Sequence, residues 1–132
     1  MNLLDELIDI FLTNERDTAF YDLKTKGIVN DWNEAETGEP GIDWDEVGSE
    51  ERYLGIPTIE SFEAFQLMEK FAVSVEDDRK SDKLFAALDR PRPFRQFQDA
   101  LFKLDMRDQW YDFEYQYGKK RIEEWLKEVE KE

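Results

Sequence analysis

The sequence predicts an α+β fold that is mostly helical and carries a small antiparallel sheet near its N-terminal end. A length of 132 residues suits one domain, so we expect residues 1–132 to form a single domain. Residues 18–32 have the pattern of a β-hairpin, and from Thr58 onward the apolar residues recur at helical spacing. Strands and helices do not alternate, which argues against a parallel sheet.

The first 57 residues are predicted to contain one helix and the sheet. Residues 2–13 carry one apolar stripe at helical spacing, with Asn2 as the expected N-cap. Residues 18–32 contain two runs of β-forming residues separated by a glycine-containing turn. Residues 52–57 are a possible third strand that ends at Pro57.

Residues 33–51 are predicted to be an acidic loop within the domain. They contain three glycines, one proline and several carboxylates, and no regular apolar pattern. A loop of this length is uncommon inside a compact domain and is typically mobile or functional.

The remaining residues predict about four helices. The first follows Thr58, and Ser81 is the expected N-cap of a short helix over residues 82–89. Pro93 suits the first turn of a helix over residues 93–104. A last helix spans about 106–130, and we expect Gly118 to bend or interrupt it.

The composition excludes several kinds of chemistry. The chain has no His and no Cys, which removes Ser-His-Asp and Cys-His catalysis, disulfides and Cys-ligated metals. We therefore expect a protein that is not an enzyme and has no cofactor. An enzyme that uses carboxylates and a metal is kept as an alternative, in addition to the two binding hypotheses given below. The N-terminal residues contain acids within their apolar stretch, which predicts neither a signal peptide nor a membrane span. The expected compartment is the cytoplasm.

Charge is concentrated in the first half of the chain. Residues 1–60 hold 16 acids and 4 bases, a net charge of −12, whereas residues 61–132 hold 17 acids and 14 bases, a net charge of −3. Such a field attracts basic surfaces, and tryptophan is common where binding energy concentrates. The first hypothesis is an interaction module that docks a protein partner with a basic surface. The candidate partner-binding residues are Trp32, Asp43, Trp44, Asp45 and Glu46.

The same carboxylates could be considered as ligands of Ca²⁺ or Mg²⁺. Their spacing does not match the EF-hand pattern, because the third ligand, the central glycine and the terminal glutamate are missing. We therefore assign no metal ligands, and a solvated acidic loop is the simpler explanation.

A second hypothesis is a phosphate-ligand or RNA site in the Arg-Pro-Arg-Pro-Phe-Arg segment. Arg90, Arg92 and Arg95 lie at the predicted start of a helix, where backbone amides and guanidinium groups both favour anions. The alternative is that these arginines pair with Asp89, Asp99 or the acidic half of the chain. The overall acidity disfavours nucleic acid as a general partner, although a local basic patch keeps it open. The oligomeric state is left open.

Four segments of the sequence, taken together, resemble uncharacterised protein family 0158, a group of small bacterial proteins. The resemblance covers the chain from about Thr18 to Leu126, and its most specific pieces are Ile56-Pro57, FRQF at 94–97 and the Trp110…Trp125 spacing. It implies the fold layout and a bacterial cytoplasmic origin, and it assigns no catalytic residue. The four segments are TAFYDLKTKGIVND, RYLGIPTIESFEAFQLMEKF, ALDRPRPFRQFQDAL and DQWYDFEYQYGKKRIEEWL.

Overall fold

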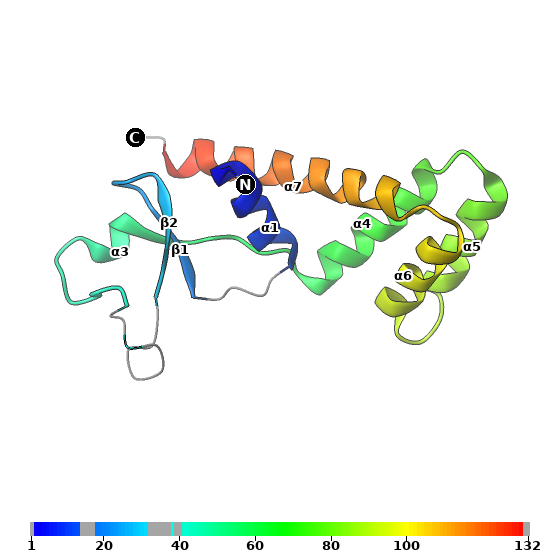
Figure 1. Ribbon diagram of the computed structural model, residues 1–132, viewed down its shortest axis with the longest axis horizontal. Helices are drawn as coiled ribbons and strands as arrows, with labels where there is room; N and C mark the ends of the chain where they lie inside the picture. The colour runs from blue at the N-terminus through cyan, green and yellow to red at the C-terminus, as the bar shows by residue number, and fades with distance from the viewer. Residues whose placement is uncertain (1, 14–17, 32–37, 39–40, 131–132) are drawn as a thin grey trace. The chain divides into compact units, whose positions relative to one another are not determined.

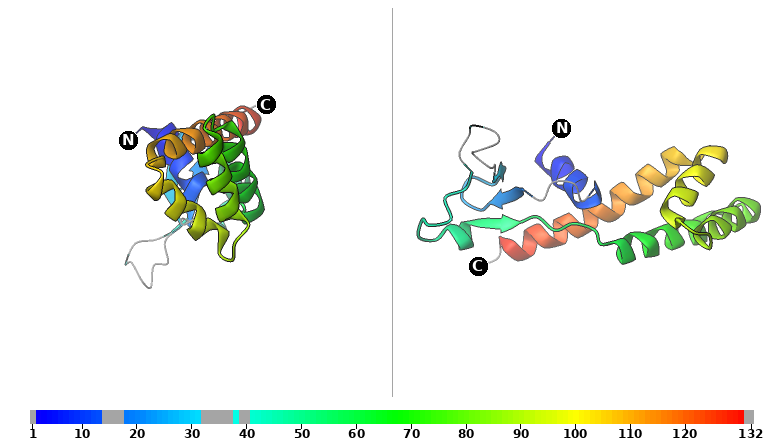
Figure 2. Two further views of the ribbon diagram at one scale, coloured as in Figure 1. Left: turned by 90° about the vertical axis from the view of Figure 1, so that its right-hand side faces the viewer. Right: turned by 90° about the horizontal axis from the view of Figure 1, so that it is seen from below.

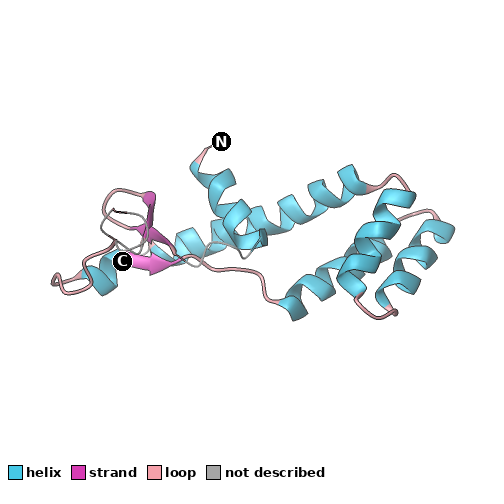
Figure 3. Ribbon diagram, turned by 60° about the horizontal axis from the view of Figure 1, so that its bottom comes forward, coloured by secondary structure: helices cyan, strands magenta, loops and turns pink. Residues whose placement is uncertain are grey.

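The computed structural model describes residues 2–13, 18–31, 38 and 41–130. Six helices and three strands occur in these residues, which confirms the mostly helical α+β class (Figure 3). The chain divides into two compact units. The first unit comprises Met1–Thr58 and Gly118–Glu132, and the second comprises Ile59–Tyr117.

The first unit opens with helix α1, Leu3–Thr13, whose apolar stripe is buried as predicted. The carboxamide oxygen of Asn2 accepts a hydrogen bond of 2.8 Å from the amide of Asp5, which is the expected N-cap interaction. The sequence pattern therefore located both the helix and its start. The buried residues of α1 are Leu7, Ile8, Ile10 and Phe11.

The sheet has three antiparallel strands in the order β2-β1-β3, with β1, Ala19–Asp22, in the centre (Figure 1). Strand β2 is Gly27–Asn30 and β3 is Tyr53–Gly55, so both the hairpin and the possible third strand are confirmed. The loop prediction for residues 33–51 was wrong at its end, because Ser49–Arg52 forms a short helix, α3. Gly48 precedes α3 in the left-handed conformation, with φ of 85°, where the chain turns back to the sheet.

The two faces of the sheet carry different side chains, because successive residues of a strand point to opposite sides. Tyr21 lies on one face, 5.5 Å from the ring of Trp125, and donates a 2.7 Å hydrogen bond to Glu130. Burial, with the Glu130 carboxylate beside it, raises the pKa of Tyr21 to about 12. The opposite face carries Phe20 and Tyr53, whose rings contact the ring of Trp44.

The last helix, α7, spans Arg107–Val129 without interruption, so the expected break at Gly118 was wrong. Gly118 is buried, and a Cβ atom placed there would lie 2.9 Å from the Cγ2 atom of Ile8. The glycine is therefore explained by the close approach of α1 to α7 within the first unit, and not by a bend.

The second unit consists of helices α4, Ser61–Ser74, α5, Asp78–Leu88, and α6, Pro93–Lys103, together with the first part of α7 (Figure 2). Asp77 caps α5 by accepting hydrogen bonds from the amides of Arg79 and Lys80.

The expected cap of α5 by Ser81 was wrong, because this residue lies within the helix. Its hydroxyl group donates to the carbonyl oxygen of Ala72 instead, at 2.8 Å. Pro93 lies in the first turn of α6, as predicted.

An aromatic cluster forms the core of the second unit. The ring of Phe71 lies 5.4 Å from Trp110, 5.3 Å from Phe113 and 6.2 Å from Phe97, all edge to face. Such pairs contribute about 0.5–1.5 kcal/mol each beyond the area that they bury. Trp110 and Phe113 therefore pack in the core, as their helical spacing predicts.

Candidate functional site

Trp44 is anchored on the open face of the sheet in the first unit. Its indole nitrogen donates to one carboxylate oxygen of Asp31 at 2.9 Å, while the other oxygen accepts the amide of Ile42 at 2.8 Å. The ring lies edge to face with Phe20 at 5.2 Å and with Tyr53 at 6.0 Å. Trp44 therefore packs against aromatic side chains that lie on two different strands.

A second set of contacts fixes the backbone around Trp44. The hydroxyl group of Ser49, a buried residue, donates to the carbonyl oxygen of Trp44 at 3.0 Å. The carboxylate of Asp43 accepts the amide of Asp45 at 3.1 Å, which closes a tight turn. Residues 41–51, which we call the acidic Trp44 segment, are thus attached to the sheet at several points.

The acidic Trp44 segment exposes both charge and apolar surface. Trp44 remains 39% exposed, and Val47 is fully exposed at 100%. The segment contains five carboxylates and no basic residue, and all five carboxylates belong to exposed residues. They are Asp43, Asp45, Glu46, Glu50 and Glu51.

The nearest basic residue along the chain, Arg52, is already engaged. Its guanidinium group donates two hydrogen bonds of 2.9 Å to the carboxylate of Asp22, which is 2% exposed. The Arg52 hydrogen bonds, with backbone amides of the β1–β2 turn, hold the pKa of Asp22 well below its usual range. Arg52 therefore serves mainly to compensate a buried carboxylate, and the negative charges of the acidic Trp44 segment remain available to solvent.

The predicted partner-binding residues lie on one short segment, apart from Trp32, which lies outside the described residues. Asp43, Asp45 and Glu46 are close together in the sequence. Even so, no group of three or more carboxylates in the described part of the chain is gathered closely enough to hold a metal ion.

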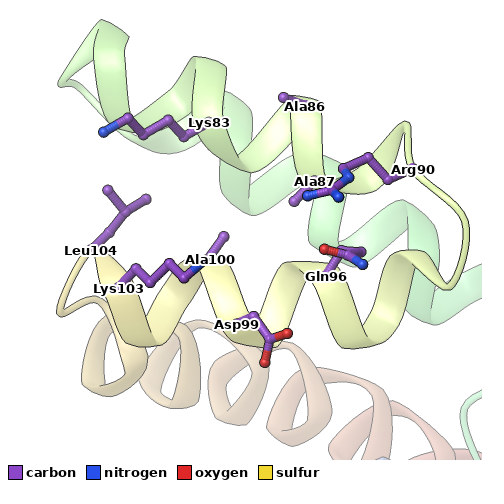
Figure 4. Close-up of a pocket in the computed structure, with 9 residues that line it drawn as sticks. All are labelled: Lys83, Ala86, Ala87, Arg90, Gln96, Asp99, Ala100, Lys103 and Leu104. Atoms are coloured by element: carbon purple, nitrogen blue, oxygen red, sulfur yellow. The ribbon is translucent and has the colours of Figure 1, made fainter.

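The second unit contains a cavity of about 350 Å³ between α5 and α6, whose helices run side by side as a hairpin (Figure 1). Figure 4 shows Lys83 facing Leu104 and Lys103 at one end of this α5–α6 groove, and Arg90 facing Gln96 at the other. The full lining consists of Lys83, Ala86, Ala87, Arg90, Gln96, Asp99, Ala100, Lys103 and Leu104.

Only one of the three arginines of the predicted anion site lies in the lining of the α5–α6 groove. Arg90 lines the α5–α6 groove, whereas Arg92 and Arg95 do not. Arg92 precedes α6 in the left-handed conformation, with φ of 57°, and both Arg92 and Arg95 are exposed. None of the three forms an ion pair with a described carboxylate, so the alternative of internal pairing with Asp89 or Asp99 finds no support among these residues.

Sequence reasoning missed Lys83 and Gln96 as candidate site residues. The register of the α5–α6 hairpin could have identified them. Residues that face each other across this hairpin have residue numbers that add up to about 186. Lys83 then faces Lys103, and Arg90 faces Gln96.

One further carboxylate on α7 has an altered titration. Burial raises the pKa of Glu114 to about 7, and the described residues provide no hydrogen-bond or charged partner for it. A carboxylate of this kind is a candidate for acid–base chemistry only where it faces a cavity. Glu114 does not line the cavities formed by the described residues of the second unit, so we do not include it in a candidate site.

Comparison with known proteins identifies the family but no characterised relative. In the described part of the chain, no helix has the length and apolar character needed to cross a membrane. No curated protein and no solved structure matches the chain significantly. The profile of one family, described as Uncharacterised protein family (UPF0158), matches residues 2–132. That match covers nearly the whole sequence, and the chain therefore belongs to the uncharacterised protein family UPF0158.

Proposed function

We propose that this protein is an interaction module that docks a partner with a basic surface through the acidic Trp44 segment. The observation that carries the proposal is the combination of a fixed and partly exposed tryptophan with five exposed carboxylates on one short segment. We place this docking in the bacterial cytoplasm, the setting that the family resemblance implies.

The rigid attachment of Trp44 favours binding. An aromatic side chain that is already held in one orientation loses little conformational freedom when a partner covers it. Its contacts with Asp31, Phe20 and Tyr53 supply that orientation before any partner arrives. Tryptophan is also among the residues that most often dominate binding energy, and the exposed Val47 adds apolar surface three residues away.

The charges select the kind of partner. Five carboxylates without a basic residue produce a negative field that accelerates the encounter with a basic surface and repels an acidic one. Because Arg52 is engaged by the buried Asp22, it does little to cancel this field. Binding should therefore weaken as the salt concentration rises.

The test neutralises charge without disturbing the anchor. Asp45→Asn, Glu46→Gln and Glu50→Gln are combined in one variant, because these side chains are exposed and make no hydrogen bond with a described residue. Trp44 and Asp43 stay unchanged, since each makes a contact that holds the segment. Partners are captured from a bacterial lysate treated with nuclease and identified by mass spectrometry. The affinity of the purified partner is then measured at low and moderate salt.

The matched control carries the same loss of three charges in the second unit, as Glu76→Gln, Asp82→Asn and Asp112→Asn, all exposed. We expect a basic partner whose affinity falls at least tenfold with the first variant and changes less than twofold with the control. Equal losses in both variants would show that only net charge matters, and retention by the first variant would contradict the proposed surface. Failure to capture any salt-sensitive partner would also contradict the proposal.

A further inference from the structure

The α5–α6 groove has a charge opposite to that of the chain. Lys83, Arg90 and Lys103 line it together with a single carboxylate, Asp99, so its lining carries a net charge of +2 where the whole chain carries −15. Figure 4 shows the Asp99 side chain directed away from the facing helix. The groove is thus a local positive region in a strongly acidic protein, which is where an anion would be attracted.

The three cations of the groove have no partner among the described residues. Neither lysine nor Arg90 forms an ion pair or a hydrogen bond with any side chain there. Their positive charge is therefore available for a ligand.

The cations lie at two ends of the groove, with an apolar floor between them. Lys83 lies in the middle of α5, whereas Arg90 lies two residues beyond the end of that helix, at the turn toward α6. Ala86, Ala87 and Ala100 occupy the space between the ends, and their small side chains leave the cavity open. Its volume of about 350 Å³ is at the lower end of the range for small-molecule pockets.

Each end offers a different set of donors for an anion. The guanidinium group of Arg90 can donate two parallel hydrogen bonds to one phosphate, and the Gln96 amide lies across from it. Lys83 and Lys103 supply two point charges at the opposite end. We propose that the α5–α6 groove binds a small organic anion that carries a phosphate group at each end of an uncharged body. This site is separate from the acidic Trp44 segment and does not depend on the proposed docking.

The test uses isothermal titration calorimetry on the full chain at low salt. The probe is fructose 1,6-bisphosphate, which carries phosphates at both ends of a sugar, and the comparison ligands are fructose 6-phosphate and inorganic phosphate. We expect the bisphosphate to bind at least tenfold more tightly than either comparison ligand, because only it can contact both ends. Equal affinity for fructose 6-phosphate would overturn the two-ended site, and absence of binding at millimolar bisphosphate would overturn the site itself.

Substitutions locate the binding. Arg90→Gln and Lys83→Gln should each weaken bisphosphate binding about tenfold, the effect of losing one charge-assisted contact. Arg79→Gln is the matched control, since Arg79 is an exposed cation on α5 that does not line the groove. All three side chains are exposed, and circular dichroism verifies that the variants remain folded.

The control also separates the groove from diffuse attraction of anions. Weakening by Arg79→Gln equal to that by Arg90→Gln would overturn the assignment. A short single-stranded RNA is the last probe. Tighter binding of this RNA than of the bisphosphate, with sensitivity to Arg79→Gln, would replace the small ligand by nucleic acid.

Discussion

The buried pair of Asp22 and Arg52 leads to the sharpest prediction for the first unit. Asp22 is 2% exposed and accepts hydrogen bonds from both Nε and Nη2 of Arg52, and from the backbone amides of Lys24 and Thr25. The change Asp22→Asn keeps Oδ1, which accepts the two amides and Nε of Arg52. It replaces the other oxygen by an NH2 group, which then faces the NH2 group of Arg52, donor against donor.

The magnitude follows from the contacts that are lost. The hydrogen bond from Nη2 of Arg52 is lost, and a hydrogen bond to a charged group contributes about 1.5–3 kcal/mol. Breaking a buried ion pair by changing one partner costs about 3–5 kcal/mol in total. The side chain of Arg52 is 30% exposed, so water compensates part of its loss. We therefore expect Asp22→Asn to lower the free energy of unfolding of the first unit by about 3 kcal/mol.

Hydrogen exchange of the hairpin peptide, residues 19–30, measures this effect within the first unit. A loss of about 3 kcal/mol predicts amide exchange more than a hundredfold faster than in the wild-type protein. Asp82→Asn, an exposed change in the second unit, should leave the hairpin rates unaltered. Hairpin exchange within threefold of the wild-type rate would refute the assigned importance of the pair.

The same pair predicts a pH dependence with a defined sign. The pKa of Asp22 is lower in the folded than in the unfolded chain, so its contribution is complete above the unfolded value of about 3.9 and disappears as the pH falls below it. The stability difference between wild type and Asp22→Asn should therefore shrink below about pH 4. Urea unfolding at pH 7 and pH 3 measures it, and a constant difference would contradict the assigned pKa direction.

Three further predictions concern single positions. Gly118→Ala should destabilise the first unit by about 1 kcal/mol in urea unfolding, because the contact with Ile8 outweighs the gain in helix propensity, and adding Ile8→Leu should reverse this. The wild-type protein should lose about 2 kcal/mol of stability from pH 5 to pH 8, because burial favours the neutral carboxyl group of Glu114, and Glu114→Gln should abolish this loss. Equal pH profiles for the two proteins would contradict this prediction. Asp31→Ala should make Trp44 more accessible, seen as stronger acrylamide quenching of tryptophan fluorescence, and unchanged quenching would show that its ring contacts suffice.

The elements could be predicted from the sequence wherever a single pattern determines them. The stripe of α1, the two strands of the hairpin and the proline at the start of α6 each depend on a few neighbouring residues, and each prediction was confirmed. The predicted glycine-containing turn was wrong in detail, because Gly27 is the first residue of β2 and Lys26 has the positive φ of 59°. The other errors occurred where a contact with a segment that is distant in the sequence determines the role of a residue. Gly118 does not interrupt α7, because its role is to accommodate Ile8, more than a hundred residues away in the sequence. Ser81 does not cap α5, because its hydroxyl group donates to the carbonyl oxygen of Ala72 on α4 instead.

The candidate sites show the same limit more clearly. Arg90, Arg92 and Arg95 look like one cluster because they are neighbours in the sequence, yet only Arg90 belongs to the α5–α6 groove. In a helical hairpin the residues that face each other are those at equal distance from the turn, so Arg90 faces Gln96 and shares the groove lining with Lys83 and Lys103, whereas Arg92 does not line the groove. Linear spacing is therefore a poor guide to a site between two helices. The test is direct: Arg92→Gln should leave bisphosphate binding within twofold of wild type, whereas Lys103→Gln should weaken it about tenfold. If Arg92→Gln weakens binding as much as Arg90→Gln does, the linear cluster is the site and the hairpin register is not.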